Sequence, residues 1–195
     1  MNKLTLNDID EKSRGEIYVQ DYSAKPTIDG IKIIPVKNFI GEDGDFSEII
    51  RMENGTVTGI EDFEVVQINR SRLLPGSIKG WHLHFQQEDI FYLPPSDSLL
   101  VGLLDLRKDS KTNGVMMKIT LGAGQSSLLY IPRGVAHGMA NLSNQDIELF
   151  YFVNQKFDAK NPDERRLPWN SVGEDFWQPK KTNLLFSSRY LGLSS

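Results

Sequence analysis

The histidines of this chain lie in two short stretches whose spacing suits proton transfer or metal binding. The whole sequence holds three of them, His82 and His84 in the run SIKGWHLH and His137 in the run IPRGVAH. The first run is typical of a β-strand, in which side chains two residues apart point to the same face. If that face lines the inside of a small barrel, Glu88 and His137 can meet the first two histidines there. We therefore predict a cluster of imidazoles and one carboxylate.

Two kinds of chemistry are open to such a cluster. Neutral imidazoles and a carboxylate can hold iron, manganese, zinc or nickel and leave an open side for water or substrate. The candidate metal ligands are His82, His84, Glu88 and His137. A histidine also suits proton transfer, because its unperturbed pKa lies near neutrality. Spacing alone does not fix ligand geometry, so His84 as a polar residue of the cavity wall and Glu88 as a turn cap are the alternatives without a metal.

The elements that must position these residues are short strands. Runs rich in β-formers are separated by clusters of Gly, Pro, Asn, Asp and Ser, and no long helix interrupts them. The predicted strands are residues 31–36, 47–52, 63–69, 77–84, 89–93, 98–106, 115–121, 127–131, 135–141 and 147–153. This succession indicates an all-β jelly-roll barrel.

The barrel accounts for the middle of the chain. We predict an N-terminal arm over residues 1–30, with a short helix near residues 6–12, and one barrel domain over residues 31–157. Residues 158–195 are polar and proline-bearing, with Trp169, Phe176 and Trp177 as apolar anchors. They are expected to form a C-terminal tail packed on the barrel.

Composition argues against several classes of partner. The formal net charge is −4 and the basic residues are scattered, so we expect no nucleic-acid partner. No stretch approaches the roughly 20 apolar residues of a membrane span, and we expect no membrane partner. The chain lacks cysteine, which excludes disulfides and thiolate chemistry and favours a cytoplasmic location.

The histidine motifs resemble the two-part signature of the cupin superfamily. The first half is His-x-His followed after three residues by Glu88, and the second half is Pro-x-Gly-x-x-His-x-x-x-Asn, from Pro132 to Asn141. This resemblance implies a cupin-type double-stranded β-helix, which is a jelly-roll barrel with its site inside.

A narrower resemblance covers residues 43–188, which are similar to the dTDP-4-dehydrorhamnose 3,5-epimerases, themselves cupins. The matching runs, in order, are GDFSE, KGWH, DLR, SKTNG, IPRGVAHG, FY and WN. The resemblance implies an isomerase without a cofactor that inverts C3, C5 or both in a dTDP-4-keto-6-deoxyhexose, for deoxysugar and polysaccharide biosynthesis. His82 takes the position of the base and Tyr151 that of the acid. Positions matched to substrate binding are Glu48, Gln67, Asn69, Lys79 and His137, and Arg189 could keep a phosphate contact.

The sequence departs from the family at four positions. Tyr190 replaces the aspartate that orients the base, Val101 replaces a second aspartate, Ile90 stands for the lysine near the ketone, and Asp43 stands for an arginine that contacts phosphate. A base without its carboxylate is less basic and less well oriented. His84 or Glu88 could compensate, and the same two residues complete the metal set.

Two alternatives therefore stand beside the epimerase. One is a metal-dependent cupin isomerase or oxygenase that uses the three histidines and Glu88, and the other is a sugar-nucleotide binding module without catalysis. In each case the partner is a small molecule. The resemblance also implies a homodimer, in which strands such as residues 63–69 are exchanged between barrels.

Overall fold

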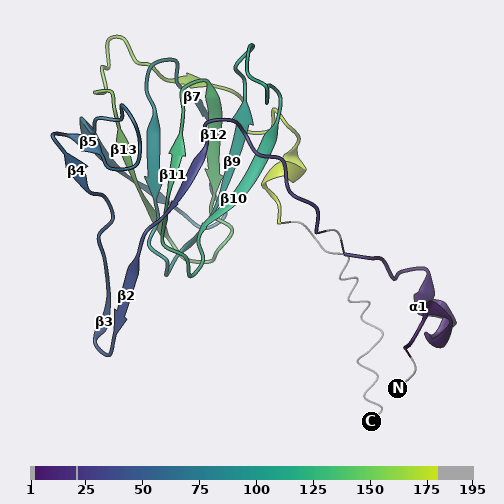
Figure 1. The fold of residues 1–195 in the computed structure, drawn as a ribbon. Helices are drawn as coiled ribbons and strands as arrows, with labels where there is room; N and C mark the ends of the chain where they lie inside the picture. The colour runs from purple at the N-terminus through teal and green to yellow at the C-terminus, as the bar shows by residue number, and fades with distance from the viewer. Residues whose placement is uncertain (1–2, 21, 180–195) are drawn as a thin grey trace.

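The computed structural model describes residues 3–20 and 22–179, and its centre is a barrel of two facing antiparallel sheets (Figure 1). The first sheet has the order β1 (Lys32–Pro35), β11 (Ser127–Ile131), β8 (Asp89–Tyr92), β13 (Ile147–Val153) and β6 (Gln67–Leu73). The second has the order β10 (Met116–Gly122), β9 (Ser98–Asp105), β12 (Val135–Ala140), β7 (Ile78–Leu83) and β14 (Arg165–Arg166). The predicted all-β, cupin-type jelly roll is confirmed.

Alternation of side chains along the strands divides the apolar residues among three layers. The largest cluster fills the space between the sheets and includes Leu103, Leu149 and Val101. A second cluster lies on the outer face of the first sheet, where Phe63 packs with Ile90. The third lies on the outer face of the second sheet. Both outer faces are thus covered, and one end of the space between the sheets is left for polar side chains.

The C-terminal segment covers the second sheet through a short 3-10 turn, Glu174–Trp177. Trp177 is 1% exposed and lies on strands that present glycines beneath it. A Cβ atom at Gly102 would come within 2.5 Å of the Phe176 ring and 2.9 Å of the Trp177 ring, and one at Gly138 within 2.8 Å of Trp177. These glycines are therefore required by close packing. We call Gly102, Gly138 and the aromatic pair above them the tail anchor.

The N-terminal arm runs away from the barrel (Figure 1). In place of one helix near residues 6–12 it has two turns, η1 (Leu6–Asp8) and α1 (Glu11–Arg14). A break separates them, because Asp10, the residue before α1, is not helical. Within the part of the chain that the structure describes, the helices are too short and too polar to cross a lipid bilayer.

The region before β6 differs from the prediction. Among the described residues, the expected strand over residues 47–52 is not formed, because β3 (Gly44–Ser47) ends where it was expected to begin. Instead, β3 forms a hairpin with β2 (Asn38–Gly41) that projects from the barrel (Figure 1). A second small hairpin joins β4 (Met52–Glu53) to β5 (Thr56–Val57). The strand expected over residues 63–69 begins only at Gln67, because Phe63 is used as a buried anchor on the outer face.

Candidate active site

A cavity of about 520 Å³ opens between the two sheets and is lined by most of the predicted site residues. Seven of them lie on its wall: Gln67, Asn69, Lys79, His82, His84, His137 and Tyr151. Residues 155–164 of the C-terminal segment also contribute, with Lys156, Asp163 and Glu164 among them. A cavity of this size with convergent polar groups is typical of a small-molecule site.

A β-bulge in β7 brings Lys79 and His82 to the same wall. His82 pairs with His137 and Lys79 pairs with Met139, so β7 has one residue more than β12 between these two pairs. In a regular strand, side chains three residues apart would point to opposite faces. The extra residue shifts the alternation of side chains by one position, as β-bulges do. The cationic amine and the imidazole therefore both face the cavity.

The two charged neighbours of the His82 ring assign its tautomer. Its Nδ1 atom lies 3.4 Å from Oε1 of Glu164, and its Nε2 atom lies 3.2 Å from an N–H group of Arg166. Since the arginine can only donate, Nε2 carries the lone pair and Nδ1 carries the proton. Burial, followed by the charge of Arg166, lowers the pKa of His82 to about 4. The imidazole is therefore neutral at pH 7, and its Nε2 lone pair accepts a hydrogen bond from Arg166, which a substrate must displace before Nε2 can take its proton.

Glu164 was not predicted as a site residue. It immediately precedes β14, which pairs Arg166 with His82 and so brings the carboxylate to the imidazole. The resemblance placed the carboxylate partner of the base at Tyr190, which lies outside the described residues, as does Arg189. A strand as short as β14 leaves no periodic signal in the sequence, and the position of Glu164 follows only from strand pairing.

Tyr151 faces the same cavity from the opposite sheet. It lies on β13, and its ring packs against Phe91 with the centroids 5.9 Å apart. Burial, followed by the charge of Asp89, raises the pKa of Tyr151, so the phenol keeps its proton at neutral pH. The cavity thus has a proton acceptor on one wall and a proton donor on the other.

The predicted binding residues divide into two groups. Gln67 donates to Asn69 at 2.7 Å, and the Lys79 amine donates to the Ser71 hydroxyl at 2.7 Å, both on the cavity wall. Glu48 lies elsewhere, because its exposed carboxylate forms an ion pair with Arg51 at 2.8 Å. The structure of one chain therefore supports the first group as cavity residues and does not bring Glu48 to them.

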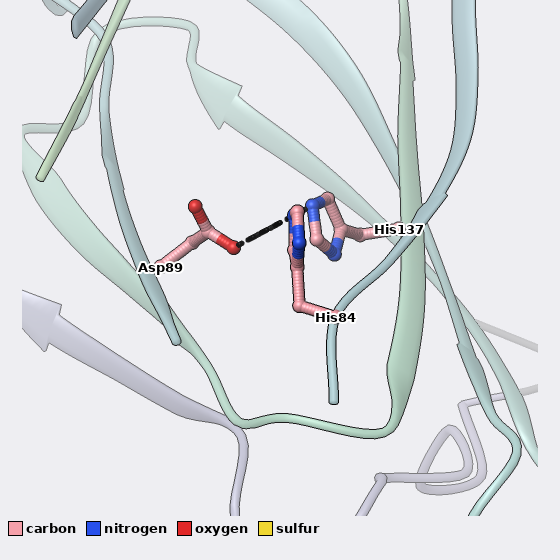
Figure 2. Close-up of side chains that lie close together, drawn as sticks. All are labelled: His84, Asp89 and His137. Carbon is pink, nitrogen blue, oxygen red and sulfur yellow. Dashed lines mark ion pairs between the residues drawn. The ribbon is translucent and has the colours of Figure 1, made fainter. Parts of the chain in front are cut away.

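The acidic residue near the histidines is Asp89 and not Glu88. Glu88 accepts a hydrogen bond from Asn154 at 3.1 Å and lies 3.6 Å from Arg133. Asp89 opens β8, is 2% exposed and points toward His84 and His137 (Figure 2). Neighbouring residues of a strand face opposite ways, so only one of the two acids can enter the cavity.

This register separates the residues that were predicted as metal ligands. The donor atoms of His84, Asp89 and His137 all lie within 4.8 Å of one another, whereas His82 and Glu88 fall outside that group. His82 instead stacks on His137, with the ring centroids 5.8 Å apart and the planes 8° from parallel. The register also sends Ile90 to the outer face of its sheet, and Val101 belongs to the barrel core. The charged family side chains expected at these two positions have no counterpart there.

The turn between β7 and β8 is held by Asp163. Its carboxylate accepts backbone N–H hydrogen bonds from Phe85 at 3.0 Å, Gln86 at 2.6 Å and Gln87 at 2.8 Å. Burial alone would raise the pKa of Asp163, but these donors lower it overall. The backbone carbonyl of the same residue accepts a hydrogen bond from Nδ1 of His84. One residue of the C-terminal segment therefore fixes both the turn and the imidazole.

Comparison with known proteins identifies the family of the chain. Residues 25–185 match the family model described as dTDP-4-dehydrorhamnose 3,5-epimerase. The spore coat polysaccharide biosynthesis protein SpsL of Bacillus subtilis is 35% identical over 143 residues, 73% of this chain and 91% of the relative. A dTDP-4-dehydrorhamnose 3,5-epimerase of Sinorhizobium fredii is 28% identical over 179 residues, 89% of this chain and 87% of the relative.

A solved structure of an epimerase has a similar fold. The dTDP-6-deoxy-D-glucose-3,5-epimerase of Legionella pneumophila, in complex with dTDP-4-keto-L-rhamnose, superposes with a TM-score of 0.62 at 25% identity. The superposition covers 74% of this chain and 76% of the other. The family model spans most of the barrel and its C-terminal segment, where the cavity residues lie. The chain belongs to the dTDP-4-dehydrorhamnose 3,5-epimerase family.

Proposed function

We propose that this protein is a nucleotide-sugar epimerase that inverts C3, C5 or both in a dTDP-4-keto-6-deoxyhexose, in deoxysugar or polysaccharide biosynthesis. The observation that carries the proposal is the placement of His82 and Tyr151 on opposite sheets of one cavity. Membership of the epimerase family supports the substrate class.

The two walls suit inversion of a carbon next to a ketone. A base on one face removes the proton as an enolate forms, and an acid on the other face returns a proton with the opposite configuration. Neutral His82, with its Nε2 lone pair, serves as the base, and the protonated phenol of Tyr151 serves as the acid. Glu164 then balances the positive charge that His82 gains.

The remaining polar groups of the cavity suit a charged, hydroxylated ligand. Lys79 supplies a positive charge for the diphosphate, though without the paired donors of an arginine. Gln67 and Asn69 offer amide groups to sugar or base atoms beside it. These contacts position the substrate so that the C–H group next to its ketone faces the base.

The test is solvent-deuterium incorporation into dTDP-4-dehydro-6-deoxyglucose, followed by NMR with metal-depleted protein. We expect exchange at C3, C5 or both. The His82→Asn variant is expected to lose exchange by about 10²–10⁴-fold, the usual contribution of general acid–base catalysis. Tyr151→Phe is expected to slow product formation by a similar range.

Tyr92→Phe is the matched control, because this tyrosine belongs to the cluster on the outer face of the first sheet and should leave the rate unchanged. Binding of the nucleotide sugar with no exchange in the wild-type protein would contradict the proposal and favour a binding module. Exchange that survives in His82→Asn would contradict the assignment of the base.

We also propose that the protein forms a homodimer in the cytoplasm. The β2–β3 hairpin supports the dimer, because it exposes Phe39 at 50%, Ile40 at 84% and Phe46 at 67%. Such side chains on a projecting hairpin are typical of a surface that packs against another chain. A monomeric mass by light scattering would contradict the dimer.

A further inference from the structure

We propose that His84, Asp89 and His137 form a binding site for one first-row divalent metal ion, such as Zn²⁺, Fe²⁺, Mn²⁺ or Ni²⁺. The site lies beside the proposed base and is distinct from it. The inference goes beyond the epimerase proposal and does not depend on it. It rests on the orientation of the two imidazoles and on the buried carboxylate that faces both of them (Figure 2).

Both imidazoles present a lone pair to the carboxylate. Nδ1 of His84 donates to the backbone carbonyl of Asp163, and Nδ1 of His137 lies 3.2 Å from the backbone carbonyl of Val135. A carbonyl oxygen accepts only, so each ring carries a proton on Nδ1, and the neutral form of each ring has its lone pair on Nε2. An Nδ1–H group tied to a backbone carbonyl is the usual support for a histidine that binds metal through Nε2.

The carboxylate lacks a matching donor among these rings. Oδ2 of Asp89 lies 3.7 Å from Nε2 of His84 and 3.7 Å from Nε2 of His137, which is too long for a hydrogen bond. Gln87 donates to the other oxygen, Oδ1, at 3.1 Å and also lies 3.4 Å from Nε2 of His84. A buried carboxylate that faces two nitrogen lone pairs is unfavourable, and either a proton or a metal cation held among the three groups relieves it.

The distances from the carboxylate suit a metal ion with little movement, whereas the donor atoms of the two imidazoles, which lie within 4.8 Å of each other, have to approach further. Ligands bound about 2.0–2.2 Å from a tetrahedral ion lie about 3.4 Å from one another. The two distances of 3.7 Å from the carboxylate oxygen therefore need to shorten by only a few tenths of an ångström. Two imidazoles and one carboxylate form a donor set used for zinc and for non-haem iron, and they leave open positions toward the cavity.

The sequence supplies matched variants for the test. Asp89→Asn keeps the shape of the side chain and removes the charge between the imidazoles. Glu88→Gln makes the same change on the neighbouring residue, whose carboxylate faces Asn154. His82→Asn removes the third histidine, which lies outside the proposed set.

The first experiment measures metal content and thermal stability of the full chain without substrate. We expect about one equivalent of metal in the wild type, and a Tm rise of about 5–10 °C when Zn²⁺ exceeds its Kd a hundredfold. Asp89→Asn should bind at least 100-fold more weakly, while Glu88→Gln and His82→Asn bind as the wild type does. Wild-type binding weaker than about 1 mM, or equal loss in Glu88→Gln, would overturn the site.

The second experiment remains informative even if Asp89→Asn fails to fold. The wild-type chain with ¹⁵N-labelled histidine gives one pair of ring signals for each of its three histidines. On addition of Zn²⁺ we expect large shifts at Nε2 of His84 and His137, with Nδ1 still protonated, and a small change at His82. No shift at these two Nε2 atoms would overturn the site. Because neither measurement needs a sugar substrate, each outcome is separate from success or failure of the epimerase proposal.

Discussion

Glu164 is the residue through which the C-terminal segment acts on the proposed base. Its carboxylate faces the Nδ1–H group of His82, so it selects the tautomer in which Nε2 can accept a proton. It also stabilises the imidazolium that forms after proton transfer, as the acidic member of a catalytic triad does. Glu164 does not need to touch the substrate to influence the rate and is therefore a positioning residue.

Replacing Glu164 with glutamine tests this role. The amide keeps an oxygen for the Nδ1–H group but loses the charge that balances the imidazolium, so we expect kcat to fall about tenfold or more with little change in KM. Glu164→Asp should restore part of the rate, because it keeps the charge. Glu174→Gln, at an exposed position of the same segment, is the control. Steady-state kinetics decide, and an unchanged kcat in Glu164→Gln would refute the role.

At the scale of residues, the sequence predicted those cavity residues that belong to recognisable motifs. His82, His137 and Tyr151 are found on the cavity wall because their motifs mark the barrel strands that carry them. The choice between Glu88 and Asp89 depends on a strand register of one residue, which no pattern in the polar turn before β8 determines. Glu164 depends on a pairing across 82 positions of the chain and is equally invisible to local patterns.

At the scale of elements, the bulge in β7 explains how Lys79 and His82 both reach the cavity wall. The His-x-His spacing correctly predicted that His82 and His84 share a face. The same alternation would have turned Lys79 to the other side, and only the irregular pairing with β12 places it on the wall. Strand positions were predictable from turn residues and β-formers, whereas the late start of β6 depends on the burial of Phe63 on the outer face.

The connection between β9 and β10 is held in its conformation by hydrogen bonds to one buried residue. Asp105 is fully buried and accepts hydrogen bonds from Arg107 at 2.8 Å, Ser110 at 2.6 Å and Thr112 at 2.7 Å. Burial would raise the pKa of Asp105, but these hydrogen bonds lower it well below its usual range. The connection is thus tied to the ionised carboxylate.

This network predicts a pH dependence of stability. The native pKa of Asp105 is depressed, so its stabilisation is present above the unfolded pKa of about 3.9 and is lost as the pH falls through the native value. Asp105→Asn should cost about 1–3 kcal/mol in free energy of unfolding at pH 7, with a smaller difference from wild type below about pH 4. Urea unfolding at both pH values checks this. Asp109→Asn, exposed in the same connection, should change little, and a pH-independent difference for Asp105→Asn would contradict the prediction.

At the scale of the whole molecule, the tail anchor connects the outer face of the barrel to the cavity. Trp177 packs on Trp81 with the ring centroids 4.9 Å apart, and its indole N–H donates to the Trp169 carbonyl at 2.7 Å. The segment held in this way also contains Glu164 and Asp163, which support His82 and His84. Of the aromatic residues of the tail, Phe176 and Trp177 pack on the second sheet, whereas Trp169 is 42% exposed.

Gly102→Leu is expected to displace this segment, because the new side chain would occupy the space of Phe176 and Trp177. We expect earlier proteolytic cleavage after residue 157 and loss of most epimerase activity, although Gly102 lies outside the cavity. Trp177→Ala should destabilise the protein by about 3–5 kcal/mol, as for other buried aromatic residues. Gly15→Ala is the control, since an added Cβ there meets nothing within 4 Å. Full activity with an intact tail in Gly102→Leu would contradict the coupling.

The position of β14 in the chain also has a consequence for synthesis on the ribosome. The strands from β1 to β13 emerge first, and a chain generally folds as its N-terminal part becomes available. The barrel strands can therefore leave the ribosome before Glu164, Asp163 and the tail anchor do. In a nascent chain the barrel strands are thus available before His82 is oriented. Catalysis begins only after the turn Glu174–Trp177 has packed on the barrel.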